Sequence, residues 1–312
     1  MSRMLYVLPQ WDWAGGAAEL QRMSEKAYPL ETRYLPDGRM TAGHMSAAEV
    51  IFGAPDPVML AQAPQLQWLH LPCAGADRYA DLRLYANSRV TLTTSAGVYG
   101  VPMAEHALML FLALARMLRE QDAEWGAPRE LYKATVVILG LGDVGRTLAV
   151  RLSSFETRTL GVRRNLLEKP PHVHELFDMR GLHMALAQAD FIAGCLPLTR
   201  ETAGLLDAAA FAAMKPGAVF VNVGRGPVVD TAALCDALTG GHLWGAGLDV
   251  TDPEPLPPEH PLRSLPNVIL TPHAAGLSVR SVSRRLALFE RQLTRYLAGR
   301  SLYNVVDFFR GY

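Results

Sequence analysis

Three residues suited to proton transfer and anion binding follow probable buried strands in the second half of the chain. Arg225, Glu254 and His273 each stand at or just beyond the end of an apolar run. In an open parallel sheet the carboxyl ends of the strands share one edge, where ligands bind. An arginine, a glutamate and a histidine that converge there are difficult to explain as core packing. These residue types indicate acid–base chemistry on a bound anion; the alternative is a surface network of salt bridges.

A glycine-rich segment earlier in the chain has the form of a dinucleotide-binding turn. The apolar run Val136–Leu139 leads into Gly140-Leu-Gly142-Asp-Val-Gly145, and a helical pattern follows. Gly140 allows a tight turn, Gly142 lets the backbone approach a pyrophosphate, and Gly145 lets the helix pack closely on the strand. The helix dipole favours an anion at the helix N-terminus, and the backbone amides of Asp143 and Val144 would bind it.

Two arginines follow the next strand, where an NAD-binding unit normally has an acidic residue about 20 positions after its glycines. Arg163 stands 18 residues after Gly145, with Arg164 beside it. Because two guanidinium groups can bind a ribose 2′-phosphate, the pair favours NADP(H) over NAD(H), although NAD(H) is possible. The alternative is a solvated arginine pair at a strand end. A further strand ends in a segment that we expect at the same sheet edge and near the cofactor, with Leu196, Pro197 and Thr202.

Short apolar runs and helical patterns alternate along the whole chain, which is typical of parallel α/β sheets. The first series of expected strands comprises Met4–Leu8, Val50–Phe52, Gln67–Leu71 and Val90–Thr93, with helical stretches at Ala17–Tyr28 and Val58–Ala63. The second series begins at Thr135 and continues to Thr271. Between them lies a helical stretch, about Pro102–Glu124, which is apolar around nearly its whole circumference up to Leu114. Such a helix is buried, either in an ordinary core or partly by a second subunit.

The composition excludes several classes of protein. The chain has 312 residues, of which 50% are hydrophobic and 19% charged, so it is not disordered. Lys+Arg and Asp+Glu are both 30, and no basic stripe is visible, which argues against nucleic-acid binding. No apolar run approaches the roughly 20 residues of a membrane span, and the start of the chain does not resemble a signal peptide. Three widely spaced cysteines fit a reducing, cytoplasmic setting, and no spacing suggests a metal site.

The ordered motifs resemble the D-isomer specific 2-hydroxyacid dehydrogenase family, which is NAD(P)-dependent, and within it the glyoxylate/hydroxypyruvate reductase A type. The segment from Phe211 to Gly226 is similar to the family's second signature. The third is matched by Leu248-Asp-Val250, by Glu254-Pro255 and by Thr271-Pro-His273, and the ending Arg310-Gly-Tyr312 resembles the tail of the reductase A branch. The resemblance covers nearly the whole chain.

The resemblance implies a role for each residue of the trio. His273 would be the general acid that protonates the carbonyl oxygen of a 2-oxo acid. Glu254 would bond the other ring nitrogen and orient the imidazole. Arg225 would hold the substrate's carboxylate and carbonyl oxygen. Asp249 resembles the family residue that bonds the nicotinamide carboxamide, and the same family segments add further cofactor contacts at Val223, Gly224, His273 and Gly276.

Two further expectations follow from the family. The loop from Leu71 to Asp77 resembles the one whose backbone binds the substrate carboxylate, here with Ala74 and Gly75. The family usually dimerises through the long helix, which predicts a homodimer through residues 102–124. In related reductases an aromatic residue after this helix reaches the neighbouring subunit's active site, a role that Trp125 could have. His106 in the helix is expected to be a packed or capping histidine, and the alternative is a catalytic role.

The expected fold is α/β, with two doubly wound parallel-sheet domains. A flavodoxin-like substrate domain would comprise residues 1–98 and 277–312, and a Rossmann NAD(P)-binding domain residues 99–276, with the active site in the cleft. The expected reaction is NADPH-dependent reduction of a small 2-oxo acid, such as glyoxylate or hydroxypyruvate, to the D-2-hydroxy acid. The alternatives are a dehydrogenase for a larger D-2-hydroxy acid and a non-catalytic NAD(P)-sensing regulatory protein.

Overall fold

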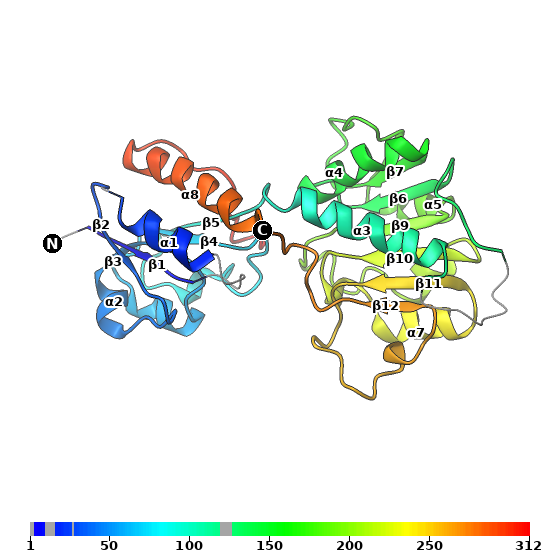
Figure 1. Ribbon diagram of the computed structural model, residues 1–312, viewed down its shortest axis with the longest axis horizontal. Coiled ribbons are helices and arrows are strands. Elements are labelled where there is room, and N and C mark those ends of the chain that lie inside the picture. The colour runs from blue at the N-terminus through cyan, green and yellow to red at the C-terminus, as the bar shows by residue number, and fades with distance from the viewer. Residues whose placement is uncertain (1–2, 10–15, 27, 119–126) are drawn as a thin grey trace. The chain divides into compact units, whose positions relative to one another are not determined.

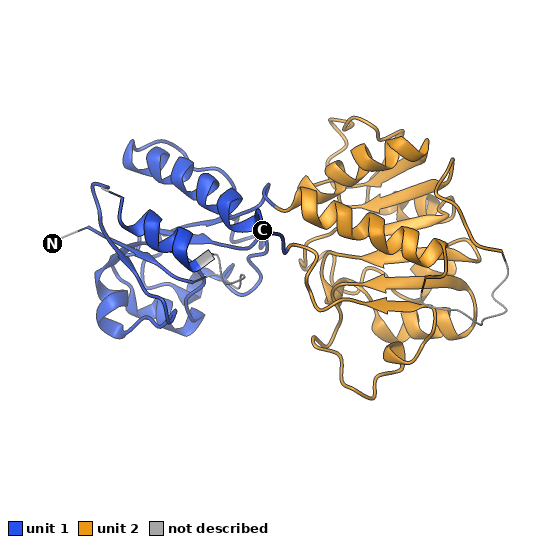
Figure 2. Ribbon diagram, viewed as in Figure 1, with its two compact units in different colours: residues 1–98, 277–312 blue, residues 99–276 orange. Residues whose placement is uncertain are grey.

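The computed structural model describes residues 3–9, 16–26, 28–118 and 127–312 (Figure 1). The chain forms two compact units, which Figure 2 shows in different colours: residues 1–98 with 277–312, and residues 99–276. These bounds coincide with those expected from the sequence. In the described part of the chain, none of the helices has the length and hydropathy needed to cross a membrane.

Unit 1 is built on a five-stranded parallel sheet with the strand order β2-β1-β3-β4-β5. This is the flavodoxin-like order of a doubly wound sheet. The strands are β1 (Met4–Val7), β2 (Glu31–Tyr34), β3 (Ala48–Phe52), β4 (Trp68–Leu71) and β5 (Thr91–Thr94), and the helices are α1 (Gly16–Ser24), α2 (Ala42–Ala47) and α8 (Ser281–Leu297).

Helices cover both faces of the unit 1 sheet, so the inner strands β1, β3 and β4 are buried on both sides. Helices α1 and α8 pack on one face, where Phe289 of α8 stacks on Phe52 with ring centroids 4.1 Å apart and on Trp68 at 5.2 Å. Helix α2 covers the other face with the fully buried Met45. The aromatic stack explains why the end of the chain belongs to unit 1, because α8 completes its core.

Unit 2 contains a seven-stranded parallel sheet in the order β12-β11-β10-β9-β6-β7-β8. The strand order reverses between β6 and β9, as in a Rossmann fold, and such a switch point is where dinucleotides bind. The strands are β6 (Thr135–Leu139), β7 (Arg158–Val162), β8 (Glu175–Phe177), β9 (Phe191–Gly194), β10 (Ala218–Asn222), β11 (Leu243–Leu248) and β12 (Val268–Leu270).

The helices of unit 2 form two layers around this sheet. One apolar core contains residues of α3 (Gly100–Ala115) and α4 (Asp143–Leu152). The other contains residues of α5 (Leu182–Leu186), α6 (Ala208–Ala212) and α7 (Thr231–Thr239). Helices therefore cover both faces of the sheet, and a ligand would be expected at the carboxyl ends of the strands.

The predicted elements need three corrections. The helix expected at about Pro102–Glu124 is α3, which ends at Ala115: Met117 takes a left-handed φ of 56°, and the amides of Met117 and Leu118 bond the oxygens of Leu114 and Ala113. This is a Schellman termination. The stretch expected as a helix at Val58–Ala63 is a short 3-10 helix, Pro57–Gln62. Strands β2 and β8 were not predicted, because both are short, partly exposed edge strands without a long apolar run.

Candidate active site

His273 and Glu254 form a direct hydrogen bond at the carboxyl end of the unit 2 sheet. The distance from His273 Nδ1 to Glu254 Oε1 is 2.6 Å, and the two side chains are 50% and 41% exposed. Glu254 also accepts from the Thr251 amide through Oε2, at 3.3 Å. The carboxylate is thus fixed to its own loop and oriented toward the imidazole, and a solvent-accessible His–Glu pair is an arrangement suited to proton transfer.

The pair belongs to loops that follow neighbouring strands. Arg225 lies beyond β10, Glu254 beyond β11 and His273 beyond β12, and these three strands are adjacent in the sheet. The first two loops also pack tightly, because a Cβ on Gly226 would lie 1.9 Å from the backbone oxygen of Thr251. Glycine at position 226 therefore keeps the Arg225 segment against the Glu254 loop.

Arg225 has an extended backbone, with a φ of −141° and a ψ of 139°, just before a short 3-10 helix. Its Nη1 donates to the Gly224 oxygen at 2.8 Å, and its own backbone oxygen accepts from Asn222 Nδ2 at 3.1 Å. These local bonds fix the start of the side chain and its guanidinium beyond the end of β10. The structure places Arg225 on the same sheet edge as the His–Glu pair.

Asp249, which is only 2% exposed, holds the loop that contains His273 through hydrogen bonds. Its Oδ1 accepts from Thr271 Oγ1 at 2.7 Å and from the Ala274 amide at 2.8 Å, and its Oδ2 accepts from the Ala275 amide at 3.0 Å. The Asp249 backbone oxygen accepts from the His273 amide. The family resemblance implies a nicotinamide contact for Asp249; the structure adds that its carboxylate holds the histidine loop.

The glycine turn has the geometry of a pyrophosphate cradle. Gly140 has a φ of 96°, and a Cβ there would lie 2.8 Å from the Cys195 oxygen. A Cβ on Gly145 would lie 2.0 Å from the Gly140 oxygen, so both positions require glycine. Gly142 is the N-cap of α4, and a Cβ there would meet nothing within 4 Å. The residues thus leave open backbone at a helix N-terminus, which fits a dinucleotide phosphate.

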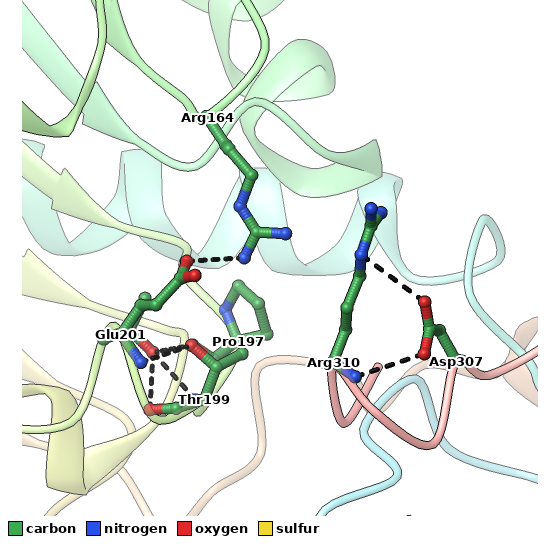
Figure 3. A network of polar contacts seen from close by, with 7 residues as sticks. Arg164, Pro197, Thr199, Glu201, Asp307 and Arg310 are labelled. Atoms are coloured by element: carbon green, nitrogen blue, oxygen red, sulfur yellow. Dashed lines mark hydrogen bonds and ion pairs between the residues drawn. The ribbon is translucent and has the colours of Figure 1, made fainter.

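The two arginines after β7 have polar partners on neighbouring segments. Arg164 Nη2 lies 2.6 Å from Glu201 Oε2, and Figure 3 shows Arg164 pointing toward Glu201, next to Pro197 and Thr199. Arg163 Nη1 donates to the Glu168 oxygen at 3.1 Å. The Thr202 hydroxyl donates to the Pro197 oxygen at 2.7 Å, so this side chain shapes the loop. The Arg164–Glu201 pair is exposed, which makes it weak and exchangeable.

In unit 1, the loop expected to bind a carboxylate rests on a buried polar network. His70 is fully buried; its Nδ1 lies 2.7 Å from Thr93 Oγ1 and its Nε2 3.2 Å from Ser95 Oγ. Desolvation lowers the pKa of His70 to about 3, so the ring is neutral. The Ser95 amide bonds the Cys73 oxygen at 2.9 Å, which joins the network to the loop that contains Ala74 and Gly75.

The structure shows an unexpected contact for His106 and does not describe Trp125. His106, expected to be only packed or capping, contacts the histidine loop: its Nε2 lies 2.9 Å from Thr271 Oγ1. The position of His106 inside an apolar helix gave no sign of this contact. Trp125 lies outside the described residues. Among the residues that are described, no group of three or more His, Cys, Asp or Glu could hold a metal ion.

Comparisons with known proteins show the family. The model of the D-isomer specific 2-hydroxyacid dehydrogenase NAD-binding domain matches residues 106–275. Glyoxylate/hydroxypyruvate reductase B of Citrobacter koseri is 36% identical over 73% of this chain and 75% of its own length. The D-3-phosphoglycerate dehydrogenases of Mycobacterium that match, at 34–35% identity, are longer, and the chain spans about half (49%) of their length.

Two solved structures are similar over the complete chain. One is a D-isomer specific 2-hydroxyacid dehydrogenase of Xanthobacter autotrophicus in complex with NADPH and MES, with 30% identity, a TM-score of 0.84 and 100% coverage of both chains. The other is an NADPH-dependent glyoxylate/hydroxypyruvate reductase of Sinorhizobium meliloti in complex with NADP and sulfate, with 27% identity, a TM-score of 0.85 and the same coverage.

The fold and the site define an NAD(P)-dependent oxidoreductase with a Rossmann domain and a second parallel-sheet domain. The chain belongs to the D-isomer specific 2-hydroxyacid dehydrogenase family. It is accordingly an NAD(P)-dependent 2-hydroxyacid dehydrogenase or 2-oxo acid reductase.

Proposed function

We propose that this chain uses NADPH to reduce a small 2-oxo acid, of the glyoxylate or hydroxypyruvate type, to the D-2-hydroxy acid. The observation on which this rests is the 2.6 Å bond between His273 Nδ1 and Glu254 Oε1, on the sheet edge that also presents Arg225. Similarity to two glyoxylate/hydroxypyruvate reductases, one described as NADPH-dependent, supports the choice of substrate and cofactor.

The chain's own residues would handle the charge and the proton of this reaction. When bound, the reduced nicotinamide supplies a hydride to the ketone carbon. Arg225 would hold the substrate carboxylate and carbonyl oxygen, which orients the ketone and stabilises the negative charge that develops on that oxygen. Because Glu254 occupies Nδ1, His273 would give its proton to the oxygen from Nε2. Glu254 would then stabilise the charged ring before the transfer and orient it throughout.

Backbone amides of unit 1 would supply a second contact for the carboxylate. The loop with Ala74 and Gly75 has a glycine where a ligand must approach closely, and Cys73 Sγ bonds the Gly75 oxygen at 3.1 Å, which fixes the turn. We propose Ala74 and Gly75 as substrate-binding residues.

The cofactor would lie along the switch point of the unit 2 sheet. The pyrophosphate would contact the turn at Gly142 and the amides of Asp143 and Val144. The 2′-phosphate would bind Arg163 and Arg164, and it would replace Glu201 as the partner of Arg164. A phosphate attracts the guanidinium more strongly than one exposed carboxylate does. The other proposed cofactor contacts are Gly140, Gly145, Leu196, Pro197, Thr202, Val223, Gly224, Asp249, His273 and Gly276.

The experiment is an initial-rate assay at the nicotinamide absorbance band with glyoxylate, hydroxypyruvate, pyruvate and phenylpyruvate, each with NADPH and NADH. We expect turnover of the two small polar substrates with NADPH preferred. In an Arg163→Ser/Arg164→Ser variant we expect the KM for NADPH to rise about tenfold or more, with the KM for NADH unchanged. The loss of hydrogen bonds to the charged 2′-phosphate costs at least about 1.4 kcal/mol, which corresponds to a tenfold change. Arg180→Ser is the control, since Arg180 is exposed like Arg164.

Other results of the assay would replace parts of this proposal. Turnover of phenylpyruvate alone would indicate a dehydrogenase for a larger D-2-hydroxy acid. Tight NADPH binding without turnover of any substrate would favour the regulatory, NAD(P)-sensing protein. A preference for NADH would remove the role given to Arg163 and Arg164 while leaving the His–Glu pair in place.

We also propose that the protein is a homodimer formed through the α3 region and that it works in the cytoplasm. Helix α3 packs on α4 and on the sheet, yet it exposes Val101, Met109 and Leu112, at 38%, 47% and 36%. Val150 of α4 is 49% exposed. Exposed apolar side chains on one helix pair are the kind of surface that a second copy covers. The cytoplasmic location rests on the three widely spaced cysteines.

A further inference from the structure

His106 contacts the loop of the proposed proton donor although it lies on a helix 165 residues earlier in the chain. Its Nε2 is 2.9 Å from Thr271 Oγ1 and 3.7 Å from Asp249 Oδ1. The His106 side chain is 16% exposed and the Asp249 side chain 1%. The contact is therefore largely sheltered from water, where hydrogen bonds to a carboxylate are strong.

The direction of each hydrogen bond follows from the number of protons. The Thr271 hydroxyl has one proton, and both oxygens of the Asp249 side chain already accept from backbone amides. At 2.7 Å, Thr271 must therefore donate to Asp249 Oδ1. The Thr271 oxygen is then an acceptor for His106, so Nε2 of His106 has a proton and donates it. The result is a directed chain from α3 through the hydroxyl to the buried carboxylate.

Asp249, the last member of this series of hydrogen bonds, fixes the backbone at His273. Asp249 accepts from the amides of Ala274 and Ala275, directly after His273, and its backbone oxygen accepts from the His273 amide. His273 itself has a φ of 52°, in the left-handed region that residues with a side chain avoid. Such a conformation persists only when the surroundings impose it, and here the bonds to Asp249 impose it.

We propose that His106 and Thr271 are positioning residues: they hold Asp249 in the orientation that fixes the left-handed backbone, and so the imidazole direction, of His273. This inference rests on the proposed function, in which His273 donates a proton. Neither residue touches the substrate in this account. Their effect is on the geometry of proton transfer, where a small misplacement of the donor lowers kcat more than it lowers binding.

The first test compares variants that remove or keep each donor. Thr271→Val keeps the shape of the side chain and removes the hydroxyl, whereas Thr271→Ser keeps the hydroxyl. His106→Leu removes the donor, whereas His106→Gln places an amide N–H near the position of Nε2. We expect about a tenfold lower kcat in Thr271→Val and His106→Leu, and recovery in Thr271→Ser and His106→Gln.

A purely structural role would give a different result. The melting temperature would then fall in Thr271→Val and His106→Leu, while kcat per folded molecule stayed within about twofold of wild type. That result would overturn the proposal, and so would an equal loss of kcat in the variants that keep the donors. Because the two positions test the same chain of bonds, one soluble pair of variants is sufficient.

The second test needs no turnover, so it separates this inference from the proposed function. In protein labelled with ¹⁵N-histidine, long-range proton–nitrogen spectra report the tautomer of each ring. His106 and His273 are assigned through His106→Gln and His273→Ala. We expect the Nε2–H tautomer at His106, and displaced His273 ring signals in Thr271→Val but not in Thr271→Ser. An Nδ1–H tautomer at His106, or His273 signals that do not respond, would overturn the inference even in an active enzyme.

Discussion

Replacement of His70 by glutamine should remove a defined part of the acid sensitivity of folding. The wild-type ring is fully buried with a pKa lowered to about 3 by desolvation, against an ordinary value of 6.5. Between these two values the unfolded chain binds a proton that the folded chain does not. Stability is therefore fully present above about pH 6.5 and is lost as the pH falls below it.

The size of this loss follows from the neutral folded ring. Between pH 7 and pH 5 the folded ring stays neutral. The pKa of His70 in the unfolded chain therefore sets the change in the free energy of unfolding, which is about 2 kcal/mol. In His70→Gln that part of the pH dependence should be absent. The baseline stability of the variant does not matter, because the prediction concerns the change with pH.

The assay is urea unfolding followed by circular dichroism at pH 7, 6 and 5 for wild type, His70→Gln and the control His183→Gln. His183 is an exposed histidine. The free energy of unfolding should fall by about 2 kcal/mol less in His70→Gln than in the other two proteins. An equal fall in all three would refute the argument that burial keeps His70 neutral in the folded protein.

Two further predictions concern the active site and the assembly. Glu254→Gln keeps a hydrogen-bond acceptor for His273 Nδ1 but loses the negative charge, so kcat should fall about tenfold in steady-state kinetics; an unchanged kcat would contradict the role of the charge. Met109→Asp on α3 should give monomers in sedimentation velocity, while Met184→Asp, at a 63% exposed position on α5, should leave dimers; dimers in both would place the interface elsewhere.

Much of the fold and of the candidate site could be predicted because the sequence signals, short motifs and apolar runs that mark strands, are local. The glycine turn after β6 needs only a strand, three glycines and a helix in order. Arg225, Glu254 and His273 were found because each follows a strand, and the carboxyl ends of parallel strands share an edge. The order β10-β11-β12 then makes the three loops neighbours. Strand β2 escaped prediction since an edge strand exposed on alternate residues has no apolar run.

The contact of His106 with Thr271, and the second role of Asp249, were decided by the tertiary structure alone. Both depend on how α3 is rotated over the sheet, which determines whether position 106 faces the core or the histidine loop. Helical periodicity could not settle this, because α3 is apolar on nearly all sides. The left-handed φ of His273 is equally non-local, because bonds to a carboxylate 24 positions earlier impose it. The sequence by itself therefore determined which residues have the chemistry, and the packing of α3 determined what holds them in place.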